Sequence, residues 1–453
     1  MKPLLIFEAN EVPWRLIDYL KDDPRFSNLS RFFSEASTWT THAQQEKELS
    51  PWITWPSLHR GMTPDEHGIN FLGQDPSHFK GTPIWQEYRE RGLSIGVCGS
   101  LQSWPPTEPG PKGFFVPDVF AQSPQCYPSW LEPFQSFNQQ QVRENGLVVR
   151  RNSIFSKEVL NVMKALPSLK LRPKTYVRIL GQLLFERLSK RHIAKRQTFQ
   201  AMLYWDAFKT LVKAQGLPEL STFFTNHVAS AMHRYWHELF PNDFKDDAPP
   251  GSTGGLWFAI KILDEMLGEA MQLVKLNPNL TIAFASSMGQ GPCTRPRYEG
   301  VSLLLPKVDR LMALCGLAPN EYRQNFAMVP QVALRIDSDK IRAKTQVALR
   351  SARVGGKVLF AIHEIGETLS VSVNTPSKSS LNTGYFSLLG NQVSWADAGM
   401  TIEAVEVGTA YHIPEGILGI WGTGERAGQR LSDRVDMPLS QVKSLLMTYA
   451  GVL

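Results

Sequence analysis

Short apolar runs alternate along the chain with segments that have helical spacing. Leu4 to Phe7 and Leu280 to Ala285 are almost wholly apolar, as strands buried on both faces of a sheet are. Val12 to Tyr19 and Phe258 to Leu276 instead place apolar residues at helical intervals. Strands alternating with helices predict an α/β fold with a doubly wound, mostly parallel sheet flanked by helices.

Three stretches depart from this rhythm within what we expect to be a single domain, 1–453. Residues 104–140 are rich in Pro, Ser, Gln and Phe and predict a long loop, and 150–216 predict basic helices. Together, 104–216 are interpreted as an insertion. The basic helices are either a solvated surface or a docking surface for an anionic membrane or glycan. Lys357 to Ile362 and Thr368 to Val373 predict a C-terminal β-hairpin.

Composition narrows the class of protein. The 453 residues are 42% apolar and 10% aromatic, which indicates a large core. Lys plus Arg exceeds Asp plus Glu by six (48 − 42), which fits an anionic substrate but is too little to indicate nucleic acid. No CxxC pair and no apolar run of about 18–20 residues occurs. The N-terminus lacks a signal-peptide pattern, so we expect a cytoplasmic protein.

The most specific motif runs from Ser50 to Ile69. Thr54 is followed two residues later by Pro56, and then by a Gly-x-x-Pro-x-x-His-Gly turn at 61–68. This pattern resembles the nucleophile region of the alkaline-phosphatase superfamily, in its phosphodiesterase, nucleotide pyrophosphatase and sulfatase-like branch. The resemblance implies that Thr54 is a nucleophile at a helix N-terminus, where amides and the helix dipole favour phosphate or sulfate. The alternative is a threonine that only caps a helix.

Three other segments are similar to the remaining motifs of that family. The first strand would end in an acidic metal ligand at Glu8, with Asn10 and Glu11 just behind. His233 and His412 occupy the positions of two metal-binding histidines. Since the motifs span residues 4 to 420 in the family's order, the resemblance covers nearly the whole chain. It implies that four side chains meet in one cleft at the carboxyl ends of the sheet strands: Glu8, Thr54, His233 and His412.

The metal motifs also depart from the family's pattern. The family uses a pair of divalent cations, commonly zinc, held by Asp and His. Ala229 stands where an Asp is expected, and Ser287-Met288-Gly289 replaces Asp-His-Gly. A two-zinc centre is therefore not expected; one divalent ion, zinc first, and no ion both remain open. His233 and His237, four residues apart, are a substitute pair of ligands on one helical face.

These residues predict a metal-assisted hydrolase or transferase that acts on a phosphate or sulfate ester. Thr54 would attack, and Glu8 would hold a metal or orient Thr54. Asn10, Ser287 and Trp55 are the expected substrate contacts. A sugar-containing substrate is suggested by the tryptophans near the motif: Trp52, Trp55, Trp85 and Trp104. A glycan-processing transferase with altered or absent metal, and a degenerate module that binds an anionic glycan or lipid, are the alternatives.

Overall fold

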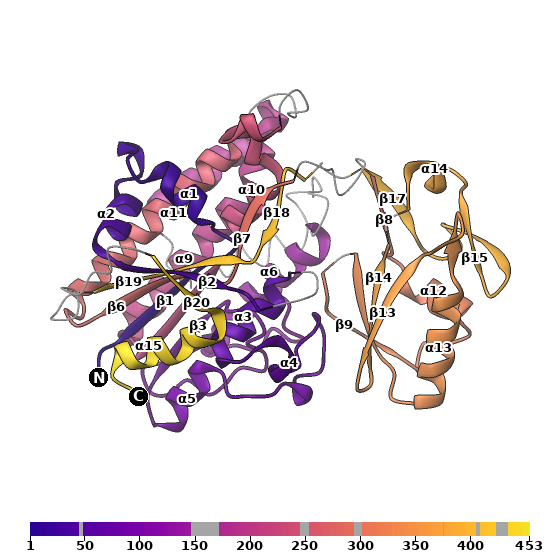
Figure 1. Cartoon of the computed structure of the whole chain (residues 1–453), viewed down its shortest axis with the longest axis horizontal. Helices are drawn as coiled ribbons and strands as arrows, with labels where there is room; N and C mark the ends of the chain where they lie inside the picture. The colour runs from indigo at the N-terminus through magenta and orange to yellow at the C-terminus, as the bar shows by residue number, and fades with distance from the viewer. Residues whose placement is uncertain are drawn as a thin grey trace.

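The larger part of the molecule is built around one eight-stranded sheet (Figure 1). The computed structural model describes residues 1–44, 49–145, 172–244, 253–293, 301–328, 330–374, 376–404, 408–422 and 434–453. In sheet order the strands are β20 (Val435–Pro438), β2 (Ser37–His42), β19 (Glu415–Gly422), β6 (Thr281–Ser286), β1 (Leu4–Ala9), β5 (Leu220–Thr225), β3 (Ile95–Cys98) and β4 (Phe114–Val116). All pairings are parallel except those of β19, which confirms a mostly parallel sheet.

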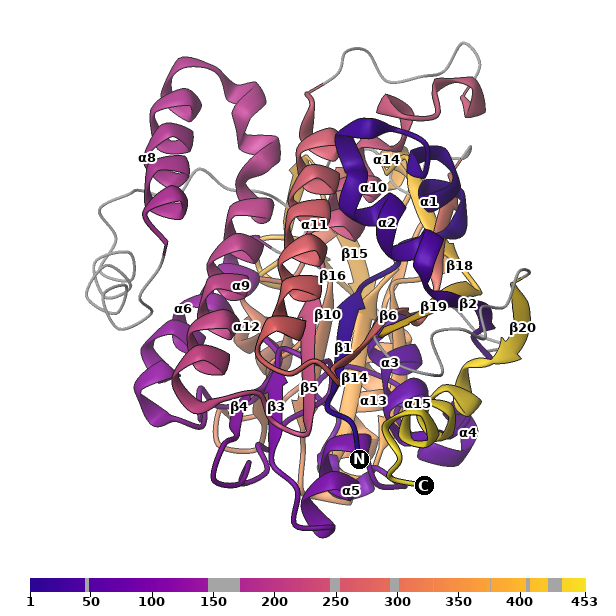
Figure 2. The ribbon, with the colours of Figure 1, turned by 90° about the vertical axis from the view of Figure 1, so that its left-hand side faces the viewer.

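Helices cover both faces of this sheet, as the alternating pattern predicts (Figures 1 and 2). One face carries α1 (Trp14–Leu20), α2 (Ser27–Glu35), α9 (Arg196–Gln215), α10 (His227–Tyr235) and α11 (Gly255–Met271). The other carries α3 (Pro51–Arg60), α5 (Ile84–Glu90) and α15 (Val442–Ala450). Successive strand residues point to opposite faces, so β1 gives Leu5 and Phe7 to one core and Leu4 and Ile6 to the other.

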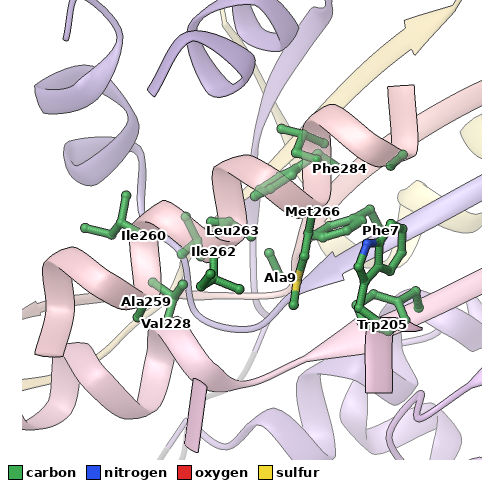
Figure 3. Close-up of a cluster of buried hydrophobic side chains, with 14 of the residues drawn as sticks. Phe7, Ala9, Trp205, Val228, Ala259, Ile260, Ile262, Leu263, Met266 and Phe284 are labelled. Atoms are coloured by element: carbon green, nitrogen blue, oxygen red, sulfur yellow. The ribbon is translucent and has the colours of Figure 1, made fainter. Parts of the chain in front are cut away.

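Aromatic side chains fill the core beside β1 (Figure 3). Phe7 meets the edge of Trp205 at a centroid separation of 5.7 Å and stacks on Phe284 at 6.0 Å. Phe284 also contacts the rings of Phe32 and Phe33 from α2. Since each ring is large and apolar, this cluster fixes the position of β1 relative to the helices that cover it. It thereby also fixes the position of the loop that follows Ala9.

Residues 104–216 contribute more to the sheet layers than the sequence indicates. The expected long loop contains β4, an edge strand of the central sheet, and the start of α6 (Glu132–Asn145). The basic stretch includes α8 (Pro173–Leu188) and α9, whose Trp205 and Phe208 lie in the main core. The first part of that basic stretch, up to residue 171, lies outside the described residues. Among the described helices, none is long and apolar enough to cross a bilayer.

A smaller lobe, residues 301–404, has a hydrophobic core of its own (Figure 1). It contains a sheet of β13 (Phe360–Ile365), β14 (Thr368–Val373), β10 (Gln331–Arg335) and β9 (Arg323–Asn325), beside α12 (Val308–Leu314) and α13 (Asp339–Ser351). A second sheet comprises β12 (Lys357–Val358), β11 (Arg353–Val354), β15 (Tyr385–Leu388) and β16 (Asn391–Ser394). The predicted hairpin is confirmed as β13–β14, but it is one part of this separately packed lobe.

Phe284→Ala tests the aromatic cluster. The phenylalanine is fully buried, so we expect the substitution to lower the free energy of unfolding of the larger lobe by about 3–5 kcal/mol. Val347→Ala on the exposed side of α13 should change stability by less than about 0.5 kcal/mol. Denaturant unfolding followed by tryptophan fluorescence reports mainly the larger lobe, because Trp395 is the one tryptophan in residues 301–404. Equal effects of the two variants would contradict the expectation.

Candidate functional site

Polar side chains gather where three neighbouring parallel strands end. Asn10 and Glu11 follow β1, Asn226 follows β5, and Ser287 follows β6. This carboxyl edge is where open α/β sheets place their ligands. Short strand β18 (Ala410–Ile413), paired with β7 (Gly289–Pro292), brings a further segment to it.

Glu11, His233 and His412 form a compact cluster of metal-ligating groups. One ligand atom from each lies within 4.8 Å of the others. The Oε2 atom of Glu11 is 3.0 Å from Nε2 of His233 and 3.3 Å from Nε2 of His412. Helix α10 supplies His233, β18 supplies His412, and the turn after β1 supplies the buried Glu11. Three segments distant in sequence therefore converge on one carboxylate oxygen.

Backbone carbonyls orient both imidazole rings. The Nδ1 atom of His233 is 2.9 Å from the carbonyl oxygen of Ala410, and that of His412 is 2.8 Å from the carbonyl oxygen of Leu49. A carbonyl can only accept, so each Nδ1 carries the proton and each Nε2 faces Glu11. A bare Nε2 and a carboxylate oxygen repel each other, so each short contact requires a proton or a cation between the two atoms. Such second contacts orient histidine ligands in metal sites.

The carboxylate of Glu11 is strongly stabilised in its ionised form. Burial raises the pKa of Glu11, but the charges of His412 and His233 and their hydrogen bonds outweigh burial and hold that pKa well below its usual value. Asn10 also donates to Oε1 at 2.8 Å. Glu11 has a φ of +58°, a left-handed conformation that is uncommon outside glycine and concentrates at functional sites.

Gln290 takes the space beside the missing acidic ligand. Its amide nitrogen donates to Oε2 of Glu11 and, at 3.1 Å, to the backbone carbonyl of Ala229. A neutral amide thus stands next to the position where the resemblance calls for an Asp. The Oε1 atom of Gln290 is buried, and among the described residues it has no hydrogen-bond partner.

Asn10 connects this cluster to helix α3. Its Oδ1 accepts from the indole nitrogen of Trp55 at 2.8 Å, and its Nδ2 donates to Asn226 at 2.7 Å as well as to Glu11. Trp55 is fully buried and packs against Phe224. The expectation that Trp55 stacks on a sugar is therefore wrong, because its ring lies inside the core.

The hydroxyl of Thr54 lies 2.8 Å from the hydroxyl of Ser287, and both residues are buried. Helix α3 begins at Pro51, so Thr54 is its fourth residue, and its amide already donates to the carbonyl of Ser50. The amide of Thr54 is therefore already paired within the helix and does not face a substrate anion. The hydroxyl of Ser50, at the helix start, is buried and has no hydrogen-bond partner among the described residues.

Glu8 lies in a different place from the one predicted. Its side chain points to the opposite face of the sheet and accepts from Nε2 of His59 at 2.8 Å, both residues being buried. His59 packs between Trp55 and Trp85. Glu8 therefore does not join His233 and His412, and Glu11 takes that place. The sequence did contain a sign of this arrangement, because Glu11 is a second carboxylate shortly after the end of β1.

The predicted pair of His233 and His237 is not formed on one helical face. Helix α10 ends at Tyr235, and His237 lies in the following 3-10 turn, Trp236–Glu238, with its ring 6.4 Å from that of Phe244. The change of helix type rotates His237 away from the direction that four-residue spacing predicts. The partners of His233 come instead from other segments.

Two further histidines belong to the framework of the site. His227 donates from Nε2 to the carbonyl of Ala259 at 3.1 Å and accepts at Nδ1 from the hydroxyl of Thr225 at 2.6 Å. His67 closes the turn after α3, where it contacts the Ser57 hydroxyl and accepts from the amide of Ile69. Burial lowers the pKa of each to about 4, so both are neutral at pH 7.

No family model and no curated protein sequence matches the chain. Similar solved structures include murine ectonucleotide pyrophosphatase/phosphodiesterase 5 with AMP, at 11% identity and TM-score 0.42, covering 100% of this chain and 96% of that one. The human counterpart has 12% identity and TM-score 0.41 over the same shares. Phosphonoacetate hydrolase from Sinorhizobium meliloti 1021 with phosphonoformate has 13% identity and TM-score 0.47, over 99% and 96%.

The buried histidines predict a loss of stability in acid. With a pKa of about 4 when folded and 6.5 when exposed, His227 binds a proton in the unfolded state first. Stability should therefore fall as pH drops from about 6.5 to 4, with His227 contributing up to about 3 kcal/mol. His67 adds a fall in the same window. Unfolding measured across this range should give a shallower slope for His227→Gln than for the parent; equal slopes would contradict the assignment.

Proposed function

We propose that this chain is a hydrolase that cleaves a phosphate or sulfate ester with the help of one divalent cation held by Glu11, His233 and His412. The observation that supports this most is the convergence of two imidazole nitrogens and one buried carboxylate oxygen within 4.8 Å. Two histidines and one carboxylate are a donor set of catalytic zinc sites, which leave a further position open. Zinc is therefore the first candidate.

The spacing of the donor atoms fits such an ion. Zinc bonds of about 2.1 Å in a tetrahedral arrangement separate the donor atoms by about 3.4 Å. The two nitrogen–oxygen separations here are 3.0 and 3.3 Å, close to that value before any adjustment. When bound, the cation supplies Lewis-acid polarisation of the ester oxygen. Both Nε2 atoms already point inward, because their Nδ1 atoms are bonded to carbonyls.

Thr54 is the proposed nucleophile. Its place in the Ser50–Ile69 motif matches the family pattern, and its hydroxyl contacts that of Ser287 at the carboxyl edge of the sheet. The hydrogen bond from Trp55 to Asn10, and from Asn10 to Glu11, connects this part of α3 to the proposed cation site. Ser50 Oγ and Gln290 Oε1 have no partner within the described part of the chain, and we assign them to hydrogen bonds with the substrate.

A second candidate follows from the altered donor set. Gln290 and Ala229 provide no negative charge where the resemblance calls for an acidic ligand. Protons in place of a cation would then occupy the two short contacts of Glu11, and the scaffold would serve as a metal-free transferase or as a module that binds an anionic glycan or lipid. Metal content and activity measured on the same preparation distinguish the two candidates.

Glu11→Gln tests the cation site. Removing the only carboxylate of the cluster should weaken zinc binding at least about a hundredfold, because even groups that merely orient ligands contribute 10- to 100-fold. Elemental analysis and competitive zinc titration measure the change. Glu8→Gln is the matched control: it removes an equally buried carboxylate on the other face of the sheet and should leave zinc binding intact. Ester hydrolysis by the parent protein after complete metal removal would contradict the proposed cation-assisted mechanism.

Thr54→Ala tests the nucleophile. We expect kcat/KM for generic phosphodiester, phosphomonoester or sulfate substrates to fall roughly 10³-fold or more, while zinc content stays the same. Thr54→Ser retains the hydroxyl and should keep measurable activity. Ser57→Ala alters a buried hydroxyl of the same helix that contacts His67 rather than Ser287, and it controls for disturbance of α3. Full activity of the Thr54→Ala variant would rule out Thr54 as the nucleophile, but it would not contradict the proposed cation site.

A further inference from the structure

Helix α8 turns an apolar face to solvent. Its exposed side chains recur at helical intervals and so share one face of the helix. Their exposed fractions range from 52% to 80%: Val177, Leu180, Leu184, Phe185 and Leu188. Figure 2 shows α8 at the margin of the molecule, beyond α9. We call these five residues the α8 face.

Several inward side chains of the same helix are polar. Thr175 donates to Asp206 of α9 at 2.6 Å, and Arg178 pairs with Glu265 of α11 at 2.9 Å. Glu186 is buried and pairs with Arg196 at 2.6 Å. An ordinary surface helix buries its apolar side and exposes its polar side. Part of α8 reverses this arrangement: Tyr176 packs on the main core, but the five residues of the α8 face stay exposed to solvent, and such a face is typical of a docking surface.

The sequence around α8 is strongly basic. Residues 172–196 contain eight Lys or Arg and one acid, Glu186, a net charge of +7 (8 − 1). Three acids from α9 and α11 pair with cations of this segment and leave +4 (8 − 4): Asp206, Glu265 and Glu269. An exposed apolar helix face within a segment of net positive charge is typical of helices that lie on anionic lipid surfaces.

We propose that the α8 face docks the protein onto an anionic lipid surface. The five apolar side chains would enter the headgroup boundary, and the net positive charge of residues 172–196 would attract the lipid phosphates. Charge favours this partner over a second copy of the chain, because two α8 faces would bring like charges together. This docking is independent of the proposed ester hydrolysis and would hold for a metal-free protein as well.

The test compares vesicle binding of the full chain and of the triple variant Leu180→Gln, Leu184→Gln, Leu188→Gln. Glutamine retains helix propensity, and these positions are exposed, so the fold should be unaffected. We expect the parent to cosediment with vesicles of phosphatidylcholine and phosphatidylserine but weakly with phosphatidylcholine alone. The triple variant should bind the mixed vesicles about a hundredfold more weakly or worse. Added salt should weaken binding of the parent.

A matched control places the same change elsewhere. Leu276→Gln combined with Val347→Gln replaces two comparably exposed apolar residues far from α8 in sequence and should leave vesicle binding unchanged. Three outcomes would overturn the proposal: a parent that does not bind mixed vesicles, a triple variant that binds as well as the parent, or a parent dimer that the triple variant dissociates. The last outcome would assign the α8 face to contact between copies.

Discussion

The candidate site depends on one buried carboxylate and the two imidazoles that face it. Glu11 is enclosed by protein, and without the two histidines burial would favour its neutral form. His233 and His412 come from a helix and a strand nearly 180 residues apart, and the Nε2 atoms of both face this one carboxylate. The electrostatic contact therefore holds together α10, β18 and the loop after β1, and it concentrates the donor atoms that make a cation site feasible.

The orientation of this cluster comes from the backbone around it. Each imidazole is fixed through Nδ1 by a carbonyl, and the carbonyl bonded to His412 belongs to Leu49, just before α3. The start of the helix that carries Thr54 is therefore positioned by the same histidine that faces Glu11. Close packing nearby supports this arrangement: a Cβ atom at Gly416 would lie 2.2 Å from the carbonyl oxygen of Ser286, so only glycine lets β19 approach the end of β6.

The altered ligand set has a structural explanation. Ala229 leaves space beside Glu11, and Gln290 fills it with an amide that bonds to both. A neutral amide lowers the negative charge of the cluster relative to an Asp, which favours one cation over two because fewer charges remain to balance the ions. The hydroxyl pair of Thr54 and Ser287 stands at the end of β6, where the resemblance calls for a further acidic ligand. The chemistry we propose therefore uses one ion and a threonine.

The sequence by itself determined the layers of the larger lobe, the β13–β14 hairpin, and the segments that reach the site. Apolar runs and helical periods are local properties, so the doubly wound sheet could be read from them. The tertiary structure alone decided which side chains meet. Glu8 and Glu11 are both acids near the end of β1, but strand alternation sends Glu8 to His59, while a left-handed turn returns Glu11 to the histidines. The position of His237 depended on where α10 ends. Gln290 reaches the site because β7 pairs with β18, which places it opposite His412. These outcomes arise from contacts between distant segments, whose geometry no local pattern encodes.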